Sequence, residues 1–306
     1  MMRRVLLWAS RSAWLKARVP RLRFVRRAVR RFMPGETLDA ALQAADALRA
    51  SGQGVLFTRL GENLVEQAQA RAVAEHYHEA LERGAAGPRP VEMSVKPTQL
   101  GLDIDAEATF GHLDGLARHA AELGTWLWLD MERSPYVEPT LALYERLRAA
   151  HPNTGICLQA YLRRTPADLR RLLPLGPAVR LVKGAYDEPP AIAWRRRAEV
   201  SAAYLGLALP LAEAARDGRA RLALGTHDAD LVRQVAAFAA AVGVPRRLLE
   251  VHMLYGIRAD ELQRLAGQGF PAFTLVAYGE AWYPWYMRRL AERPANVAFA
   301  LRQILP

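Results

Sequence analysis

Several familiar catalytic signatures are missing from this chain of 306 residues. It has no G-x-x-x-x-G-K-[ST], G-x-G-x-x-G, H-E-x-x-H or G-x-S-x-G motif, so a P-loop, a Rossmann turn, a zincin helix and a nucleophile elbow are all disfavoured. The single cysteine, Cys157, cannot form an internal disulfide and lies in an apolar run, where a thiol usually packs as a small hydrophobe. A reducing compartment fits this composition best.

Long apolar runs and clusters of metal ligands are missing as well. No stretch approaches the roughly 20 apolar residues that a transmembrane helix needs. His76 and His78 are close in sequence, but their i,i+2 spacing does not place them on one face of a helix. We therefore predict no metal site.

The net charge of +11 is confined to one end of the chain. Residues 1–35 hold eleven Lys and Arg and no acid, while the rest of the chain holds 31 bases and 31 acids. We therefore predict a basic amphipathic arm over residues 1–35, a catalytic domain over residues 36–306 and no nucleic-acid partner. The arm suits either an anionic membrane surface or a solvated helix packed beside the domain. The expected location is cytoplasmic, with peripheral contact at the inner membrane face left open.

Eight short apolar runs alternate with amphipathic segments from Glu36 onward. The runs begin near residues 54, 91, 126, 155, 178, 221, 248 and 271 and predict strands. Helical spacing predicts helices over 36–50, 63–83, 106–123, 139–150, 166–173, 194–216, 230–242 and 259–267, and a last helix that carries residues 286–294. This alternation favours parallel strands in a single (β/α)8 barrel with an N-terminal helical arm.

Polar side chains follow the apolar runs at the points where the strands should end. The active site of a (β/α)8 barrel lies at the carboxyl ends of its strands. We therefore predict that these side chains gather in one site and that the chain is an enzyme. The side chains are Lys96, Asp130, Gln159, Lys183, Thr226, His227 and Tyr278.

Residues 180–186 combine two cations with a glycine. Gly184 lacks a side chain and so permits close approach of a phosphate to the backbone. Because side chains alternate along a strand, Arg180 and Lys183 face opposite ways unless Lys183 already lies in the loop. We predict that one of them faces the barrel mouth and the other meets phosphate; two solvated cations on a surface loop are the alternative.

Arg288 and Arg289, on the predicted last helix, form a second cationic group. Guanidinium groups bind carboxylates bidentately, so an adjacent pair near a helix N-terminus can clamp a carboxylate. Neighbouring helical residues diverge by about 100°, so a shared ligand requires one of them to reach across. A solvated helix face is the alternative for such a pair taken alone.

Taken together, these segments resemble the proline dehydrogenase family, whose members are flavoenzymes on a distorted (β/α)8 TIM barrel. The resemblance runs from about Glu36 to the C-terminus and follows the family's order of motifs. It implies that the chain oxidises L-proline to 1-pyrroline-5-carboxylate in proline catabolism, with hydride transfer to N5 of FAD and a quinone as electron acceptor. It rests on residues 96–101, 129–132, 158–162, 180–186, 226–228, 253–256 and 282–294.

The resemblance also implies roles for single residues. The substrate carboxylate would be held by Lys96, Arg288 and Arg289, and Asp130 would fix them by pairing with Lys96 or Arg289. Arg180 would lie at the N5 side of the flavin and stabilise its reduced form. The substrate site would also contain Leu254, Leu275 and Tyr278. The flavin ring would contact Met131 and Gln159, the pyrophosphate and ribose would contact Lys183, Gly184, Ala185, Thr226 and His227, and Glu292 would reach the ribitol or ribose.

Several positions around the expected substrate ring depart from the family pattern. Leu275 and Trp285 stand where the family has pocket tyrosines, Trp128 where Arg is common, and His252 where Gln is expected. Two alternatives therefore stay open. One is a flavoenzyme that oxidises a related cyclic amino acid such as hydroxyproline, and the other is a degenerate barrel that acts as a binding protein.

Overall fold

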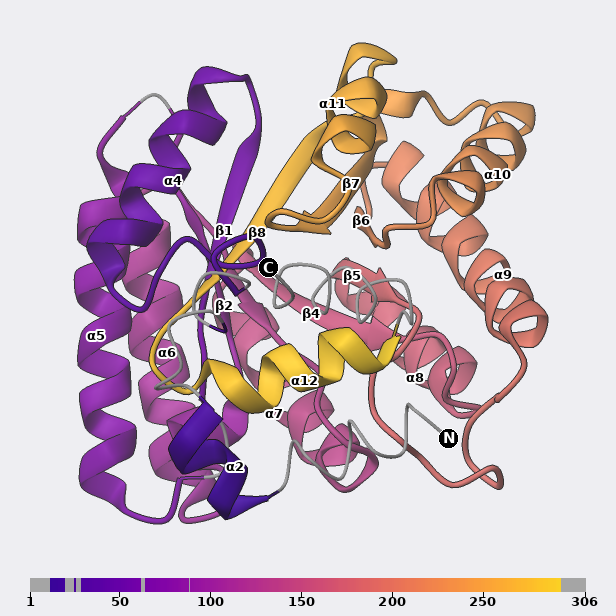
Figure 1. The fold of residues 1–306 in the computed structure, drawn as a ribbon. Coiled ribbons are helices and arrows are strands. Elements are labelled where there is room, and N and C mark those ends of the chain that lie inside the picture. The colour runs from indigo at the N-terminus through magenta and orange to yellow at the C-terminus, as the bar shows by residue number, and fades with distance from the viewer. Residues whose placement is uncertain (1–11, 20–24, 26–28, 62–63, 88, 293–306) are drawn as a thin grey trace.

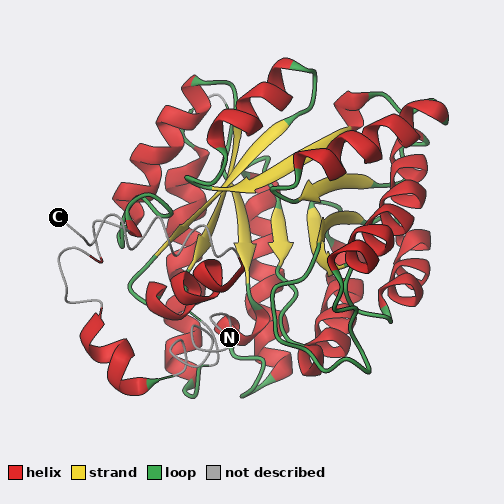
Figure 2. Ribbon diagram, turned by 45° about the vertical axis from the view of Figure 1, so that its right-hand side comes forward, coloured by secondary structure: helices red, strands yellow, loops and turns green. Residues whose placement is uncertain are grey.

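The computed structural model describes residues 12–19, 25, 29–61, 64–87 and 89–292. Eight parallel strands follow one another around a closed barrel in which β8 pairs with β1. Helices enclose the strands (Figure 1 and Figure 2). The strands are β1 (Gly54–Arg59), β2 (Glu92–Val95), β3 (Leu127–Leu129), β4 (Thr154–Gln159), β5 (Ala178–Val182), β6 (Arg221–Gly225), β7 (Leu249–Leu254) and β8 (Ala272–Tyr278).

Most of the helices lie between consecutive strands. The α-helices are α2 (Ala13–Arg18), α4 (Leu38–Ala50), α5 (Gln67–Ala85), α6 (Ala106–Glu122), α7 (Val137–Ala150), α8 (Thr165–Leu172), α9 (Arg197–Arg216), α10 (Ala229–Ala241), α11 (Ala259–Gly267) and α12 (Trp282–Glu292). Short 3-10 helices are η2 (Pro97–Leu100), η3 (Ser134–Tyr136), η4 (Leu173–Leu175) and η5 (Arg246–Leu248).

The predicted barrel is confirmed, and each strand begins within one residue of its predicted start. Among the helices, α9 begins at Arg197 rather than at residue 194. The Glu199 carboxylate accepts a hydrogen bond from the backbone N–H of Arg196 (3.1 Å) and so caps the helix at that point. The N-terminal boundary of α9 is thus set by the side chain of its third residue, Glu199.

Glycines inside the barrel leave room for large neighbouring side chains. A Cβ on Gly155 in β4 would lie 2.4 Å from Trp128 Cε3, and a Cβ on Gly225 in β6 would lie 3.2 Å from Arg180 Cγ. Trp128 is fully buried. The absence of a side chain at Gly155 and Gly225 therefore leaves the space that Trp128 and Arg180 occupy in a close-packed interior.

Helix α12 does not take the usual place of the helix that follows the last strand. Helix α4 packs on β8 and β1 there and closes the outer ring. The aromatic side chains of α12 belong to a cluster that includes Leu60 and Ala277, at the carboxyl ends of β1 and β8. Helix α12 therefore lies over the barrel mouth, and in Figure 1 it crosses in front of the strands.

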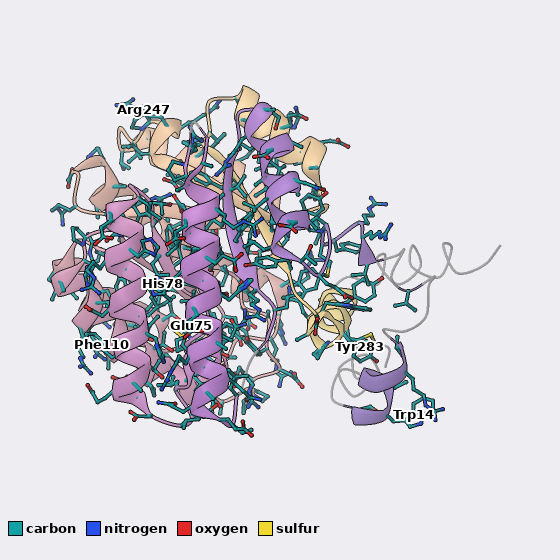
Figure 3. All side chains as sticks on the ribbon, turned by 90° about the vertical axis from the view of Figure 1, so that its left-hand side faces the viewer. Trp14, Glu75, His78, Phe110, Arg247 and Tyr283 are labelled. Atoms are coloured by element: carbon teal, nitrogen blue, oxygen red, sulfur yellow. The ribbon has the colours of Figure 1, made fainter. Side chains whose placement is uncertain are left out.

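The described part of the N-terminal arm packs against α12. Val25, Val29, Phe32 and Met33 are buried in the same cluster as the α12 aromatics, and Figure 3 shows α2 beside α12. These residues of the arm therefore pack beside the catalytic domain, which is one of the two predicted alternatives for the arm. In the part of the chain that the structure describes, no helix has the length and apolar character to cross a membrane. The division at residue 35 and contact with a membrane surface stay predictions.

Candidate active site

Asp130 is the centre of the polar cluster at the barrel mouth. It directly follows β3, and its carboxylate accepts hydrogen bonds from Ser94 Oγ (2.8 Å), Lys96 Nζ (3.4 Å) and Arg180 Nη2. Ser94 and Lys96 come from the end of β2 and Arg180 from β5. The side chains of Asp130, Lys96 and Arg180 are 17%, 11% and 5% exposed, so the cluster is largely withdrawn from water.

The charges of this cluster stabilise one another. Burial opposes ionisation of Asp130, but the Lys96 and Arg180 cations outweigh it and hold the pKa of the carboxyl below its usual value. Burial likewise opposes the charge of Arg180, and the Asp130 carboxylate more than offsets it, so the pKa of Arg180 is raised. Two cations facing one carboxylate leave a positive excess that attracts an anionic ligand.

Arg180 Nη1 and Gln159 Oε1 are buried polar atoms at the mouth that lack hydrogen-bond partners among the residues that the structure describes. Gln159 ends β4, and its Nε2 donates to the backbone oxygen of Met131 (3.2 Å), which fixes the amide. A buried donor and a buried acceptor without partners are costly, so both atoms favour a polar ligand at this place.

Glu132 holds the loop that carries Lys96. Its carboxylate accepts hydrogen bonds from the backbone N–H (3.1 Å) and the hydroxyl (2.7 Å) of Thr98 in η2. Sequence reasoning gave no role to Glu132 or to Ser94. The signal for Ser94 was its place two residues before Lys96, since residues two apart in a strand share a face.

Lys183 lies in the loop directly after β5, so the alternation of side chains along the strand does not fix its direction relative to Arg180. Its Nζ donates to Asp228 Oδ2 (2.7 Å) and lies 3.4 Å from Ser201 Oγ. Thr226 Oγ1 accepts a hydrogen bond from the backbone N–H of Asp228 (3.1 Å). Burial opposes the charge of Asp228, but Lys183 prevails and lowers the pKa of that carboxyl. Sequence reasoning missed Asp228 as the partner of Lys183.

Gly184 has a backbone φ of +114°, and a Cβ there would lie 2.1 Å from Tyr161 Cδ1. The glycine is therefore required by its own backbone conformation and by the Tyr161 ring, independently of any ligand. Ala185 follows it in the same loop. His227 lies at the next strand end, where its Nε2 is 3.4 Å from the backbone nitrogen of Leu254.

Leu275 and Tyr278 lie on opposite faces of β8. Leu275 packs with the interior cluster that contains Leu56 and Phe273. The Tyr278 hydroxyl lies 2.9 Å from His76 Nε2 on α5, in the layer between barrel and helices. The structure therefore brings Leu275, but not Tyr278, to the side of the strand that faces Arg180, and we leave Tyr278 out of the proposed substrate site.

The side chains of Arg288, Arg289 and Glu292 lie outside the described part of the structure. Their positions in the chain are on α12, the helix whose aromatic residues pack over the ends of β1 and β8. The predicted roles of these three residues stay predictions.

The neighbouring histidines His76 and His78 lie on α5, away from this mouth. His78 on α5 stacks on His119 of α6, with their Nδ1 atoms 2.8 Å apart; Figure 3 shows His78 on the outer side of the barrel. Within the described ranges, no group of three or more His, Cys, Asp or Glu side chains is arranged to hold a metal ion.

His252 makes the stability of the protein sensitive to acid. It is buried on β7 with Nε2 3.1 Å from Glu250 Oε2, and burial lowers the pKa of His252 to about 4. As the pH falls from about 6.5 towards 4, the unfolded chain therefore binds a proton that the folded chain does not, and stability is lost. We expect the free energy of unfolding to be about 2 kcal/mol smaller at pH 5 than at pH 7, measured by urea titration.

His252→Gln should remove most of that difference between pH 7 and pH 5, because the amide does not titrate. The matched control is His151→Gln, at a histidine that pairs with Asp114 outside the barrel (2.8 Å). An acid sensitivity that survives His252→Gln unchanged would assign it to other groups.

Comparison with known proteins finds relatives along the whole chain. The family model described as proline dehydrogenase matches residues 41–302. Proline dehydrogenase 1 of Bacillus subtilis subsp. natto is 33% identical over 306 residues, which cover 100% of this chain and 99% of that protein. The proline dehydrogenase of Deinococcus radiodurans is 33% identical over 281 residues, or 90% of this chain and 89% of that protein.

Solved structures with the same barrel belong to larger proteins. Proline utilization A from Bdellovibrio bacteriovorus, inactivated by N-propargylglycine, superposes with a TM-score of 0.79 at 24% identity, over 87% of this chain and 32% of that one. Proline utilization A from Bradyrhizobium japonicum gives 0.76 at 25% identity, over 92% and 33%. This chain thus spans about a third of the length of those solved proteins.

Proposed function

Because the chain belongs to the proline dehydrogenase family and is an enzyme that oxidises proline, we propose that it uses bound FAD, forms 1-pyrroline-5-carboxylate and passes the electrons to a quinone. The observation that carries the proposal is the buried cluster of Lys96, Asp130 and Arg180 at the strand ends, with its excess of positive charge.

The residues at the mouth fit a flavin. The isoalloxazine ring carries both donors and acceptors, which matches the unpartnered Arg180 Nη1 and Gln159 Oε1. Lys183 in the loop after β5 is a cation within reach of solvent, 27% exposed, and suits a diphosphate. Met131, Gly184, Ala185, Thr226, His227 and Glu292 complete the proposed FAD site. When bound, FAD supplies the acceptor for the hydride.

The protein's own part in the reaction is to hold and orient proline. Lys96, with Arg288 and Arg289 on α12, binds the substrate carboxylate, and Asp130 keeps Lys96 and Arg180 in fixed places. Hydride loss requires an unprotonated amine nitrogen. The positive excess of the cluster lowers the pKa of a substrate ammonium beside it and so favours the reactive form.

The test is to purify the protein, record its visible absorbance and assay proline, 4-hydroxyproline and other cyclic amino acids with a dye acceptor and with a soluble quinone. We expect flavin absorbance and turnover of at least one of these substrates. A colourless protein without turnover after FAD addition would leave the binding-protein alternative.

Lys183→Ala should weaken FAD binding by about 1 to 3 kcal/mol, because it removes a charge-assisted contact to the diphosphate. The measurement is the dissociation constant of FAD at moderate ionic strength. Arg195→Ala is the matched control, since Arg195 is a cation of the same loop that pairs with Asp187 (3.2 Å). Equal FAD affinity in the Lys183 variant and the parent would remove Lys183 from the cofactor site.

Leu275→Tyr should raise the preference for proline over 4-hydroxyproline. Leu275 faces the barrel interior, and an apolar wall discriminates poorly between such substrates, by about 1 to 3 kcal/mol. The measurement is the ratio of kcat/KM values for the two amino acids in parent and variant. A ratio that stays level or moves towards hydroxyproline would show that Leu275 does not line the substrate ring, or that the substrate is another cyclic amino acid.

A further inference from the structure

Five side chains deep in the barrel form a closed ring. Trp128 Nε1 donates to Glu92 Oε2 (2.6 Å), and Glu92 Oε1 accepts from Arg221 Nη2 (2.7 Å). Arg221 also donates through Nε and Nη2 to the carboxylate of Glu250 (both 2.9 Å), which lies 3.1 Å from His252 Nε2. The His252 ring then packs edge-on against Trp128, with centroids 5.7 Å apart.

The ring lies on the far side of the interior from the mouth. Glu92 and Arg221 are the first residues of β2 and β6, so they stand at the amino ends of their strands. Trp128 and His252, two positions at which the sequence departs from the family pattern, meet here although β3 and β7 do not pair. The two departures therefore belong to one structural unit.

Trp128 is the ring member that contacts the active-site cluster. Its indole lies under the Arg180 guanidinium, with Cζ 5.4 Å from the ring centroid, a cation–π distance. Its orientation is fixed by the hydrogen bond to Glu92 and by the space that Gly155 leaves for it. Trp128 thus forms the boundary between two groups of charges.

The charges on the two sides of that boundary attract one another. At neutral pH the mouth cluster has two cations and one carboxylate, whereas the ring has the acidic groups Glu92 and Glu250 and one cation, because burial keeps His252 uncharged. Burial raises the pKa of Glu92 and the Arg221 cation opposes that rise. Both Glu92 oxygens accept hydrogen bonds from N–H donors, which is the pattern of a carboxylate. Glu92 also acts on Arg180: burial opposes the arginine's charge, Asp130 most strongly raises its pKa, and Glu92 raises it more weakly. Arg180 consequently has competing partners on the two sides of the indole.

We propose that Trp128 is a positioning residue that separates Arg180 from Glu92 and Glu250 and so keeps the guanidinium paired with Asp130 at the mouth. In a low-dielectric interior, an arginine freed from this boundary is drawn to the nearest unshielded carboxylates. The inference rests on the role of Arg180 in the proposed function, because displacement of Arg180 matters there for proline oxidation.

The experiment uses the holoenzyme and the variant Trp128→Leu. We expect kcat/KM for proline to fall roughly 10- to 100-fold, since a small displacement of a catalytic cation is costly. The flavin midpoint potential should fall as well, because a cation has moved away from the reduced flavin. Adding Glu92→Gln to the Trp128→Leu variant should restore most of both losses, since it removes the competing charge.

Rescue distinguishes positioning from a general packing defect. Glu92→Gln is a second substitution in the ring and would worsen a general packing defect. It would instead relieve the competition between Glu92 and Asp130 for Arg180 that is proposed here. Trp126→Leu is the matched control: Trp126 stacks on Trp128 (6.3 Å) and on Arg221 (4.5 Å) and should leave the kinetics and potential near those of the parent. If Trp128→Leu does not fold, Trp128→Phe, which loses the hydrogen bond to Glu92, takes its place with the same rescue.

A crystal structure of the Trp128 variant supplies a readout that does not depend on the bound flavin or on turnover. Arg180 turned from Asp130 towards Glu92 would support the proposal. Arg180 still on Asp130, parent-like kinetics, or a loss that Glu92→Gln fails to rescue would overturn it. A parent enzyme without flavin or proline turnover would instead count against the proposed function, and the position of Arg180 would still decide the role of Trp128.

Discussion

Asp130→Asn is expected to lower kcat/KM for proline by more than about 100-fold and to destabilise the fold by about 3 to 5 kcal/mol. The substitution keeps the shape of the side chain and an oxygen for Ser94, but it leaves Lys96 and Arg180 as buried cations without a carboxylate. Both would then repel each other and shift from the positions that Asp130 gives them. Steady-state kinetics and urea unfolding measure the two effects.

Asp168→Asn is the matched control for the loss of a buried carboxylate that takes part in an ion pair. Asp168 is buried on α8, and its carboxylate accepts three hydrogen bonds from Arg164. This variant should lose stability while its kcat/KM stays close to that of the parent. If Asp130→Asn behaved in the same way, Asp130 would be a structural residue rather than the organiser of the mouth.

The barrel was predictable because each of its elements carries a local signal. Apolar runs of the length of a strand alternate with segments of helical periodicity, and neither signal depends on distant parts of the chain. The location of α12 was not predictable in this way. Its sequence predicts a helix, but its place over the mouth depends on Leu60, Ala277 and the buried residues of the arm, which meet only in the folded chain.

The mouth cluster was partly predictable for the same reason. The rule that side chains gather at strand ends brought Lys96 and Asp130 together. Arg180 lies inside β5 and joined the predicted site through the family resemblance, and neither argument revealed the hydroxyl of Ser94 between them. Alternation along β8 was a signal that could have separated Leu275 from Tyr278. Leu275 and Tyr278 are three positions apart in that strand, an odd number, so their side chains point in opposite directions.

The contact between Trp128 and His252 was beyond the reach of sequence patterns. Their strands are four positions apart around the barrel, and the side chains meet across its interior. Such a contact requires the closed barrel, the space left by Gly155 and the rotamers of both rings. Two unusual residues that seemed independent in the sequence are therefore coupled by closure of the sheet.

Arg288→Ala and Arg289→Ala should each cost roughly 2 to 5 kcal/mol in kcat/KM for proline, which is the usual range for removing one partner of a buried charge-assisted contact. Flavin content should stay near normal, because the proposed role of the pair is to bind the substrate carboxylate. The placement of α12 over the ends of β1 and β8 supports this role. Kinetics and the ratio of flavin to protein are the measurements.

A substrate without a carboxylate separates carboxylate binding from a general effect of the substitutions. With pyrrolidine, the parent and both variants should be similarly slow, because the contact that the variants lose is already absent. Arg264→Ala is the matched control, since Arg264 is a helical arginine of α11 that pairs with Glu261 (2.6 Å). Unchanged proline kinetics in both variants would show that Arg288 and Arg289 lie on a solvated helix face. Equal losses with proline and pyrrolidine would show that they have a structural role on α12.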